Sequence, residues 1–173
     1  MKAIILAAGK GVRMLPLTLD RPKTLIEING KPFLMHLLER LYNAGFQDKD
    51  IAIVAGYKKE KIEEFLDQHN LTITLIEQPA LVGTGDAVYL AREFVDEENF
   101  IVVGGDNLFS AEDLLRIQQD DEYCHVAGWE VENPSRYGVL VCKGEVLIEI
   151  VEKPKEFVGN LINAGLYKFT PDI

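Results

Sequence analysis

The segment from Ala3 to Lys23, AIILAAGKGVRMLPLTLDRPK, joins an apolar run to a glycine turn and carries the clearest structural pattern in the chain. The run is uninterrupted up to Ala8, which is typical of a strand in a parallel sheet that is covered on both faces. The Gly-Lys-Gly turn at residues 9–11 lets the backbone approach a ligand closely and direct its N–H groups toward it. Arg13 and Lys23 add positive charge at short range, so the segment predicts an anion-binding loop at a strand end.

Two better-known phosphate-binding loops do not fit this turn. A dinucleotide-binding loop requires a third glycine, and that position holds Met14. A P-loop requires Ser or Thr directly after Gly-Lys, and the sequence has Gly11 there. On the turn alone, a glycine-rich surface turn with scattered charges remains an alternative, because short turns of this kind are common.

Positive charge gathers around this segment although the chain as a whole is acidic. Residues 2–31 carry a net charge of +4, the whole chain carries −10, and residues 32–173 therefore carry −14. A basic region in an acidic protein predicts a small anionic ligand that is bound locally. It argues against nucleic acid as a partner, since a long polyanion would be repelled by the remaining surface.

Length and composition predict a single globular domain. At 173 residues, with 47% hydrophobic and 27% charged residues, the chain is ordinary for a soluble protein. It has no apolar run long enough to span a bilayer, and its first residues lack the cleavage pattern of a signal peptide. Cys124 and Cys142 are too few for a disulfide framework, and we expect each to be a buried, inert thiol. These features favour a cytoplasmic protein without a membrane partner.

Apolar periodicity predicts alternating strands and helices over the first 120 residues. Alternation at this spacing forms right-handed βαβ units and a parallel sheet that is covered on both faces. We therefore expect an α/β fold, a Rossmann-like three-layer sandwich with a mostly parallel mixed sheet. The predicted strands cover 3–8, 51–55, 71–77 and 100–103, and the predicted helices run from Pro32 toward Gly45, from after Tyr57 through Leu66, over 87–95 and from Ser110 to about Gln119.

From Tyr123 onward the pattern changes to strands and turns. Four apolar or alternating stretches follow, at 125–131, 137–142, 146–152 and 161–169. We find no convincing helix between them, so we expect a β-rich second half beside the sheet. At the end of the chain, Thr170-Pro171-Asp172 has the pattern of a helix start, and we expect the chain to be a truncated piece of a longer one.

Two further strand ends carry polar residues, and ligands of an open parallel sheet bind beyond the carboxyl ends of its strands. Gln78 follows the third strand, and its amide can pair with the edge of a pyrimidine base. Glycines at 83 and 85 open the next helix and suit another anion or a base edge, whereas the alternative is a solvent-facing loop capped by Thr84. Asp106 follows the fourth strand and suits phosphate-bound Mg²⁺, although a turn or helix cap is the alternative.

The order of these elements resembles the sequence pattern of the nucleotidyltransferase family that makes NDP-sugars from sugar 1-phosphates. The residues at family spacing are Leu6-Ala7-Ala8-Gly9, Gly11, Arg13, Pro16-Leu17-Thr18 and Pro22-Lys23. The resemblance extends from Ala3 to Tyr167 and implies a GT-A-like fold. It implies one nucleotidyltransferase domain over residues 1–173, with a nucleotide-binding part at about 1–120 and a C-terminally incomplete sugar-binding part at about 121–173.

The resemblance also implies roles for individual residues. As catalytic residues it implies Arg13 on the NTP phosphates, Lys23 near the α-phosphate and Asp106 on Mg²⁺. The implied nucleotide-binding residues are Leu6, Ala8, Gly9, Gly11, Gln78 and Gly83. The implied sugar-phosphate-binding residues are Asn107, Tyr137, Gly138, Glu152, Lys153 and Asn163. One carboxylate is a sparse ligand set for Mg²⁺, and the second acidic ligand of the family falls beyond Ile173.

The sequence Glu152-Lys153-Pro154 ends one of the later strands. Neighbouring side chains on a strand point to opposite faces unless the chain bends, and Pro154 favours such a bend. The resemblance implies that Glu152 binds sugar hydroxyls and that Lys153 binds the sugar phosphate. Without the resemblance, this element and those around Tyr137 and Asn163 would be interpreted as turns.

We expect an enzyme that uses Mg²⁺ to convert an NTP and a sugar 1-phosphate into an NDP-sugar and pyrophosphate. UTP or dTTP with glucose 1-phosphate is the first choice, and N-acetylglucosamine 1-phosphate is a close alternative. A phosphocholine cytidylyltransferase-like enzyme also remains open, although it has less use for Glu152 and Asn163. A non-catalytic family member is a further alternative, but it would be expected to have lost catalytic residues. The sequence leaves the oligomeric state open, a homo-oligomer included.

Overall fold

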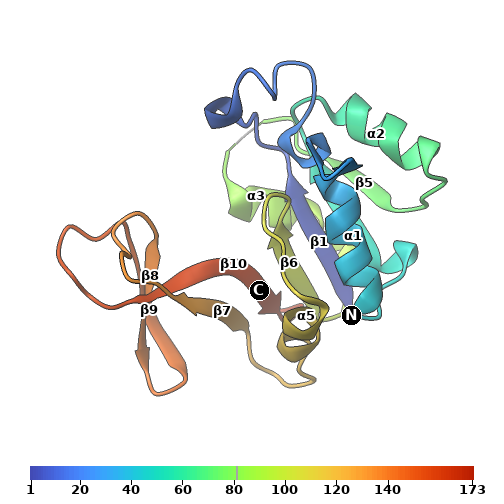
Figure 1. The fold of residues 1–173 in the computed structure, drawn as a ribbon. Helices are drawn as coiled ribbons and strands as arrows, with labels where there is room; N and C mark the ends of the chain where they lie inside the picture. The colour runs from blue at the N-terminus through green and yellow to red at the C-terminus, as the bar shows by residue number, and fades with distance from the viewer. Residues whose placement is uncertain (81) are drawn as a thin grey trace.

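A parallel sheet lies at the centre of the computed structural model, which describes residues 1–80 and 82–173 (Figure 1). Its parallel strands lie in the order β5 (Thr74–Glu77), β4 (Ile51–Ala55), β1 (Lys2–Ala7) and β6 (Phe100–Gly104). The central strand β1 has neighbours on both edges and helices on both faces, which explains its uninterrupted apolar sequence.

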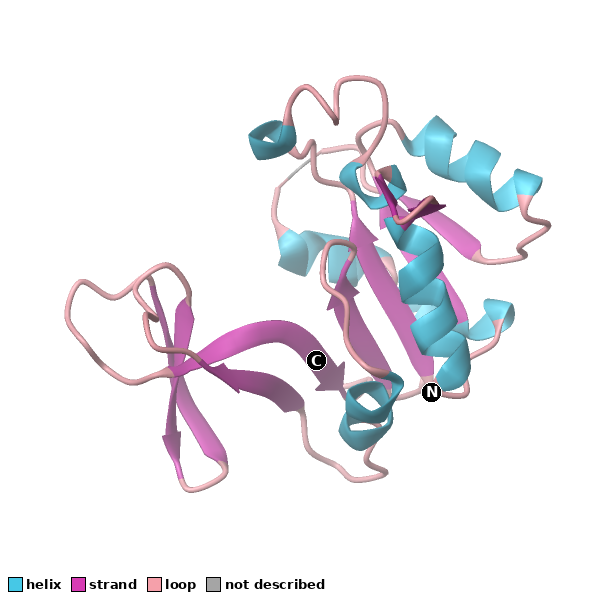
Figure 2. Cartoon of the chain, in the orientation of Figure 1, coloured by secondary structure: helices cyan, strands magenta, loops and turns pink. Residues whose placement is uncertain are grey.

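Helices cover both faces of this sheet, as Figure 2 shows. One face is covered by α1 (Phe33–Asn43), α2 (Lys59–Gln68) and α5 (Ala111–Ile117), and the other by α3 (Thr84–Leu90) and α4 (Arg92–Val95). Ile5 and Ile53 pack on the first face, whereas Ile4 and Val54 pack on the second. Successive strand residues point to opposite faces, so one apolar run serves both layers. The predicted Rossmann-like α/β fold is confirmed.

The second half continues the same sheet with antiparallel strands, instead of lying beside it. These strands are β7 (His125–Glu130), β8 (Gly138–Lys143), β9 (Val146–Glu152) and β10 (Leu161–Phe169), close to the predicted ranges. β10 pairs with β6, β7 and β8, and β8 pairs with β9. Gly165, with φ of +78°, lies within a register shift of β10, and the β8–β9 hairpin stands away from the parallel strands (Figure 1).

Short 3₁₀ helices and two-residue strands precede and follow α1 in the chain. They are η1 (Val12–Met14), η2 (Lys23–Leu25), β2 (Glu27–Ile28), β3 (Lys31–Pro32) and η3 (Asp48–Asp50). Pro32 directly precedes α1 instead of occupying its first turn, one residue from the predicted position. Gly45 follows the end of α1 with φ of +94°, the left-handed conformation for which glycine is suited there.

Three element boundaries differ from the predicted ones. β5 begins at Thr74, later than predicted, because the Leu71 N–H donates to the Leu66 carbonyl at 3.0 Å and closes the end of α2. α3 begins at Thr84, earlier than predicted. Residues 171 and 172 form a turn, so the predicted helix start is not observed there.

The two cysteines are exposed, so the prediction that they are buried thiols is wrong. Cys124 directly precedes β7, and Cys142 lies beside a register shift in the β8–β9 hairpin, away from the helices that cover the parallel strands. In the ranges that the structure describes, no helix is long and apolar enough to cross a membrane.

Lys168 on β10 is fully buried and joins the chain before β7 to the sheet. Its ammonium donates to Asp121 Oδ1 at 2.8 Å and to the main-chain carbonyls of Asp121 and Tyr123, both at 2.7 Å. His125 Nε2 lies 2.9 Å from both oxygens of the same carboxylate. An unpaired ammonium at this depth would carry a large desolvation cost, which these hydrogen bonds and the ion pair with Asp121 offset.

The Asp121 carboxylate is expected to make stability depend on pH in the acid range. The Lys168 ammonium, followed by the His125 ring, holds the pKa of this carboxyl well below its usual range. Its stabilising contribution is therefore complete above the unfolded-state pKa of about 3.9 and is lost as the pH falls through the folded-state pKa. Asp121→Asn should lower the melting temperature most above about pH 5, and the difference from wild type should shrink below about pH 4.

Thermal unfolding measured from pH 2.5 to 7 tests this expectation, with exposed Asp120→Asn as the matched control. A constant difference between wild type and Asp121→Asn over the whole range would show that the carboxylate charge does not stabilise the fold.

Candidate active site

The carboxyl ends of the parallel strands are joined to one another by main-chain hydrogen bonds. The Gly105 N–H donates to the Leu6 carbonyl at 2.9 Å, which ties the loop after β6 to β1. The Tyr57 N–H donates to the Ala8 carbonyl at 3.1 Å, which ties the turn after β4 to the glycine loop. Gln78 N–H donates to the carbonyl at the end of β4 at 2.7 Å. These loops therefore form one connected edge, at the position where open parallel sheets bind ligands.

The glycine loop folds back on itself around Gly11. This residue has φ of +61°, and a Cβ on it would lie 3.0 Å from Thr18 Cγ2 and 3.3 Å from Lys23 Cβ. The Thr18 hydroxyl donates to the Gly11 carbonyl at 2.9 Å. A Cβ on Gly9 would meet no atom within 4 Å, so the protein leaves open space there. Arg13 lies in η1 with its side chain exposed.

Lys23 and Asp106, predicted as catalytic residues, are brought together by the fold. Lys23 Nζ lies 2.5 Å from Asp106 Oδ2. Asp106 is in a turn whose preceding residue, Gly105, has no room for a side chain, since a Cβ would lie 2.6 Å from Thr24 Cγ2. In the described part of the chain Arg13 has no ion pair, so its guanidinium is available to a ligand.

Gln78 is buried, and its amide group is used inside its own loop. Its Nε2 donates to the Gly83 carbonyl at 3.0 Å and to Asp86 Oδ2 at 2.8 Å. Gly83 caps α3 with φ of +123°, whereas Thr84 makes no side-chain cap. Leu81, in the same loop, lies outside the described residues. The role of Gln78 in reading a base stays a prediction, and its contacts add a second role in holding the loop.

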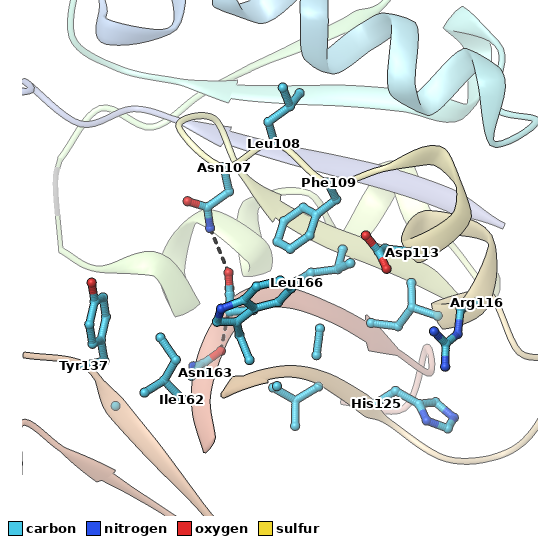
Figure 3. A pocket seen from close by; sticks show the side chains of 18 of the residues that line it. Asn107, Leu108, Phe109, Asp113, Arg116, His125, Tyr137, Ile162, Asn163 and Leu166 are labelled. Atoms are coloured by element: carbon cyan, nitrogen blue, oxygen red, sulfur yellow. Dashed lines mark hydrogen bonds between the residues drawn. The ribbon is translucent and has the colours of Figure 1, made fainter. Parts of the chain in front are cut away.

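A cavity of about 990 Å³ lies between α5 and strands β7, β8 and β10 (Figure 3). Its lining includes Asp106 and the predicted sugar-phosphate residues Asn107, Tyr137, Gly138, Glu152 and Asn163. Lys153 is outside this lining; it lies at the expected bend after β9, with φ of +45°. The chain therefore brings most of the predicted sugar-site residues into one space, next to the Lys23–Asp106 pair.

Hydrogen bonds hold the asparagines of this cavity in place. Asn107 Nδ2 donates to the Ala164 carbonyl at 3.0 Å, drawn as a dashed line below the Asn107 label in Figure 3. Asn163 Nδ2 donates to the Tyr167 hydroxyl at 2.6 Å, and its Oδ1 accepts from the Gly165 N–H at 2.9 Å. These amides are therefore oriented before any ligand binds, as a specific polar site requires.

Several cavity residues had no part in the sequence prediction. Trp129 and Arg136 line the space, and Trp129, the only tryptophan of the chain, is 68% exposed. On α5, Arg116 contributes to the lining, and His125 does so from β7. An exposed tryptophan can be recognised only after folding, because strand alternation alone does not tell which face remains open.

The chain matches the family described as Nucleotidyl transferase over residues 2–173. It belongs to this family. It is 45% identical to the bifunctional protein GlmU of Methanocaldococcus jannaschii, over 100% of this chain but 41% of that protein. It is 38% identical to the UTP–glucose-1-phosphate uridylyltransferase AglF of Haloferax volcanii, over 100% of this chain and 73% of that protein. A crystal structure of UDP-glucose pyrophosphorylase with UDP-glucose matches with a TM-score of 0.83 and 27% identity, over 99% of this chain and 76% of that one.

A divalent cation bound at this edge of the sheet would find the Asp106 carboxylate as a ligand. In the described residues no group of three or more His, Cys, Asp or Glu side chains is placed to hold a metal. The half-exposed carboxylate fits a cation that takes its remaining ligands from substrate phosphates and water, the usual arrangement for Mg²⁺. Lys23 already pairs with Asp106. A metal cation would therefore compete with the Lys23 ammonium for the Asp106 carboxylate.

Proposed function

We propose that the whole protein transfers a nucleotidyl group from an NTP to a sugar 1-phosphate, releasing pyrophosphate. The observation that carries this proposal is the position of Asp106, which lines the polar cavity and also pairs with Lys23 beside the glycine loop. In this proposal, Asp106 belongs both to the site for the NTP phosphates and to the site for the sugar. The glucose-1-phosphate uridylyl transfer named for AglF of Haloferax volcanii supports the same reaction.

The transfer needs one displacement at the α-phosphorus. An oxygen of the sugar phosphate forms a bond to the α-phosphorus while the bond to the β-phosphate oxygen breaks, and pyrophosphate leaves with that electron pair. Arg13 binds the leaving phosphates, and Lys23 neutralises the α-phosphate. Asp106 would hold Mg²⁺, and this cation would offset the phosphate charge. Lys153 binds the incoming phosphate, and Glu152 and Asn163 bind sugar hydroxyls.

The substrates proposed first are UTP or dTTP with glucose 1-phosphate. The named substrates of AglF and the bound UDP-glucose of the pyrophosphorylase structure support this choice. N-acetylglucosamine 1-phosphate is the second candidate, as the family resemblance of the sequence implies. The chain spans about two fifths of GlmU of Methanocaldococcus jannaschii, so the whole protein is the right material for substrate tests. We further propose a cytoplasmic location, where these nucleotides are available, and leave a homo-oligomer open.

We also propose that residues 1–173 form one nucleotidyltransferase domain with two parts. Residues up to about 120 bind the nucleotide, and residues from about 121 bind the sugar. Pairing of β10 with β6 supports this proposal, because it joins both parts through one sheet.

A substrate panel tests the proposed function. The whole protein is incubated with Mg²⁺ and each of UTP, dTTP, CTP, ATP and GTP against glucose 1-phosphate, N-acetylglucosamine 1-phosphate and phosphocholine, and products are identified by mass spectrometry. A UDP- or dTDP-sugar is the expected product. CDP-choline as the main product would support the phosphocholine alternative, and no nucleotidyl product from any pair would contradict the proposal.

Gln78→Ala is expected to lower the ratio of kcat/KM for UTP to kcat/KM for GTP by about tenfold. A site that hydrogen-bonds one base discriminates against another because the wrong base leaves buried polar groups of the site unpaired. Competition kinetics measure the ratio of kcat/KM values. Gln118→Ala is the matched control, since Gln118 Nε2 also makes two hydrogen bonds, to the carbonyls of Ala44 and Leu114 at 3.2 and 2.9 Å, but directly after α5. An equal change in Asp86→Asn would indicate that Gln78 acts only by holding the loop. An unchanged ratio in Gln78→Ala would remove Gln78 from base recognition.

A further inference from the structure

Tyr57 contacts both ends of the glycine loop. It follows β4, and its N–H donates to the carbonyl of Ala8, where the loop begins, at 3.1 Å. Its hydroxyl donates to the main-chain carbonyls of Thr18 and Leu19, both at 3.0 Å, where the loop ends. One residue from the turn after β4 thus contacts both ends of the segment that carries Arg13.

The contact at Thr18 continues into the centre of the loop. Thr18 is buried, and its hydroxyl donates to the Gly11 carbonyl at 2.9 Å. Gly11 in turn packs against Lys23, since a Cβ on Gly11 would lie 3.3 Å from Lys23 Cβ. A connected path therefore runs from the Tyr57 hydroxyl through Thr18 and Gly11 to the ammonium-bearing side chain.

Burial of apolar side chains does not hold this loop. Val12, Leu17 and Leu19 are 64%, 58% and 68% exposed, so the loop gains little from hydrophobic packing. Segments with few buried apolar contacts open at low free energy unless other contacts restrain them. The polar contacts of Tyr57 and Thr18 supply that restraint.

Gly56 lets Tyr57 take up its position. A Cβ on Gly56 would lie 3.0 Å from the Gln78 carbonyl oxygen and 3.2 Å from Ala8 Cβ. Only glycine fits between these two strand ends without displacing one of them. The Gly56-Tyr57 turn is therefore packed directly between the glycine loop and the Gln78 loop.

We propose that Tyr57 is a positioning residue for the nucleotide site, whose hydroxyl fixes the glycine loop so that Arg13 and Lys23 meet the NTP phosphates. Tyr57 acts through the loop and does not itself contact the nucleotide. This inference rests on the proposed function for its consequence in binding, but the restraint of the loop is a property of the protein alone.

Hydrogen exchange of the loop tests the restraint without any ligand. Tyr57→Phe is expected to raise amide exchange in residues 9–19 by about tenfold, because the loop loses its hydroxyl contacts. Tyr42→Phe is the matched control, since it also removes a half-buried tyrosine hydroxyl bond, to Asp48 at 2.7 Å, away from the loop. Equal loop protection in Tyr57→Phe and wild type would overturn the inference.

Titration with UTP and Mg²⁺ tests the consequence for binding. Tyr57→Phe should weaken UTP binding by about three- to tenfold, whereas Tyr42→Phe should stay within about twofold of wild type at a similar melting temperature. Thr18→Val should reproduce the loss, and Thr18→Ser, which keeps the hydroxyl, should restore binding. If Tyr57→Phe does not fold, the Thr18 pair decides the question alone. Failure of wild type to bind UTP would count against the proposed function, while the exchange result would still decide the role of Tyr57.

Discussion

Arg13→Ala should lower kcat/KM for pyrophosphate release by about 100- to 1000-fold, the scale of losing one preorganised group that stabilises transition-state charge. The Arg13 side chain is exposed in η1, and the described residues give it no ion pair. Exposed substitutions of this kind change stability by about 0.5 kcal/mol or less, so the melting temperature should stay within about 2 °C. Initial rates and thermal unfolding of the whole protein measure the two quantities.

Arg21→Ala is the matched control for this prediction. Arg21 is also exposed and belongs to the same basic region, but its guanidinium is paired with neighbouring Asp20 at 3.2 Å. It should keep nearly normal turnover. Arg13 would be a structural residue if Arg13→Ala unfolded much earlier while its remaining folded fraction turned over normally.

Asp106→Asn should lower activity by about 100-fold or more and raise the Mg²⁺ concentration needed for half-maximal rate. The substitution keeps the shape of the side chain but removes the charge that would bind the cation. It also removes the partner of Lys23, so the ammonium is left without its ion pair. Exposed Asp67→Asn on α2 serves as the control for a lost carboxylate elsewhere.

Asp106→Asn removes both a metal ligand and the ion-pair partner of Lys23. Mn²⁺ binding, measured by electron paramagnetic resonance, separates these two effects. Asp106→Asn should weaken Mn²⁺ binding in the presence of UTP. Lys23→Gln should strengthen binding without nucleotide, because it removes the ammonium that competes for the carboxylate. Unchanged Mn²⁺ affinity in Asp106→Asn would remove Asp106 from the metal site.

Most of the parallel half could be predicted because its signals are local. The apolar run of β1, the leucines of α1 at helical spacing and the glycine after α1 each determine the conformation of their own segment. The continuation of the sheet through β10 could not be predicted in the same way. Its pairing with β6 joins residues far apart in sequence, and the residue pattern of a strand does not determine which strand it pairs with.

The same difference between local signals and distant contacts decides which site features could be predicted. That Lys23 and Asp106 lie together follows from the rule that loops at the carboxyl ends of parallel strands converge. Gln78 bonds to groups within its own loop, and Tyr57 bonds to both ends of the glycine loop. These contacts depend on the path that each loop follows, and the type of a residue does not determine that path. The exposure of Cys142 was missed because the β8–β9 hairpin stands away from the helical layers.

Pyrophosphate release by the whole protein tests the central claim most directly. UTP or dTTP, glucose 1-phosphate or N-acetylglucosamine 1-phosphate, and Mg²⁺ are supplied together and then omitted one at a time, with released pyrophosphate and NDP-sugar both quantified. We predict equal amounts of the two products, formed only when all three components are present. Pyrophosphate released from the nucleotide alone at the same rate, or no release with any combination, would contradict nucleotidyl transfer to a sugar phosphate.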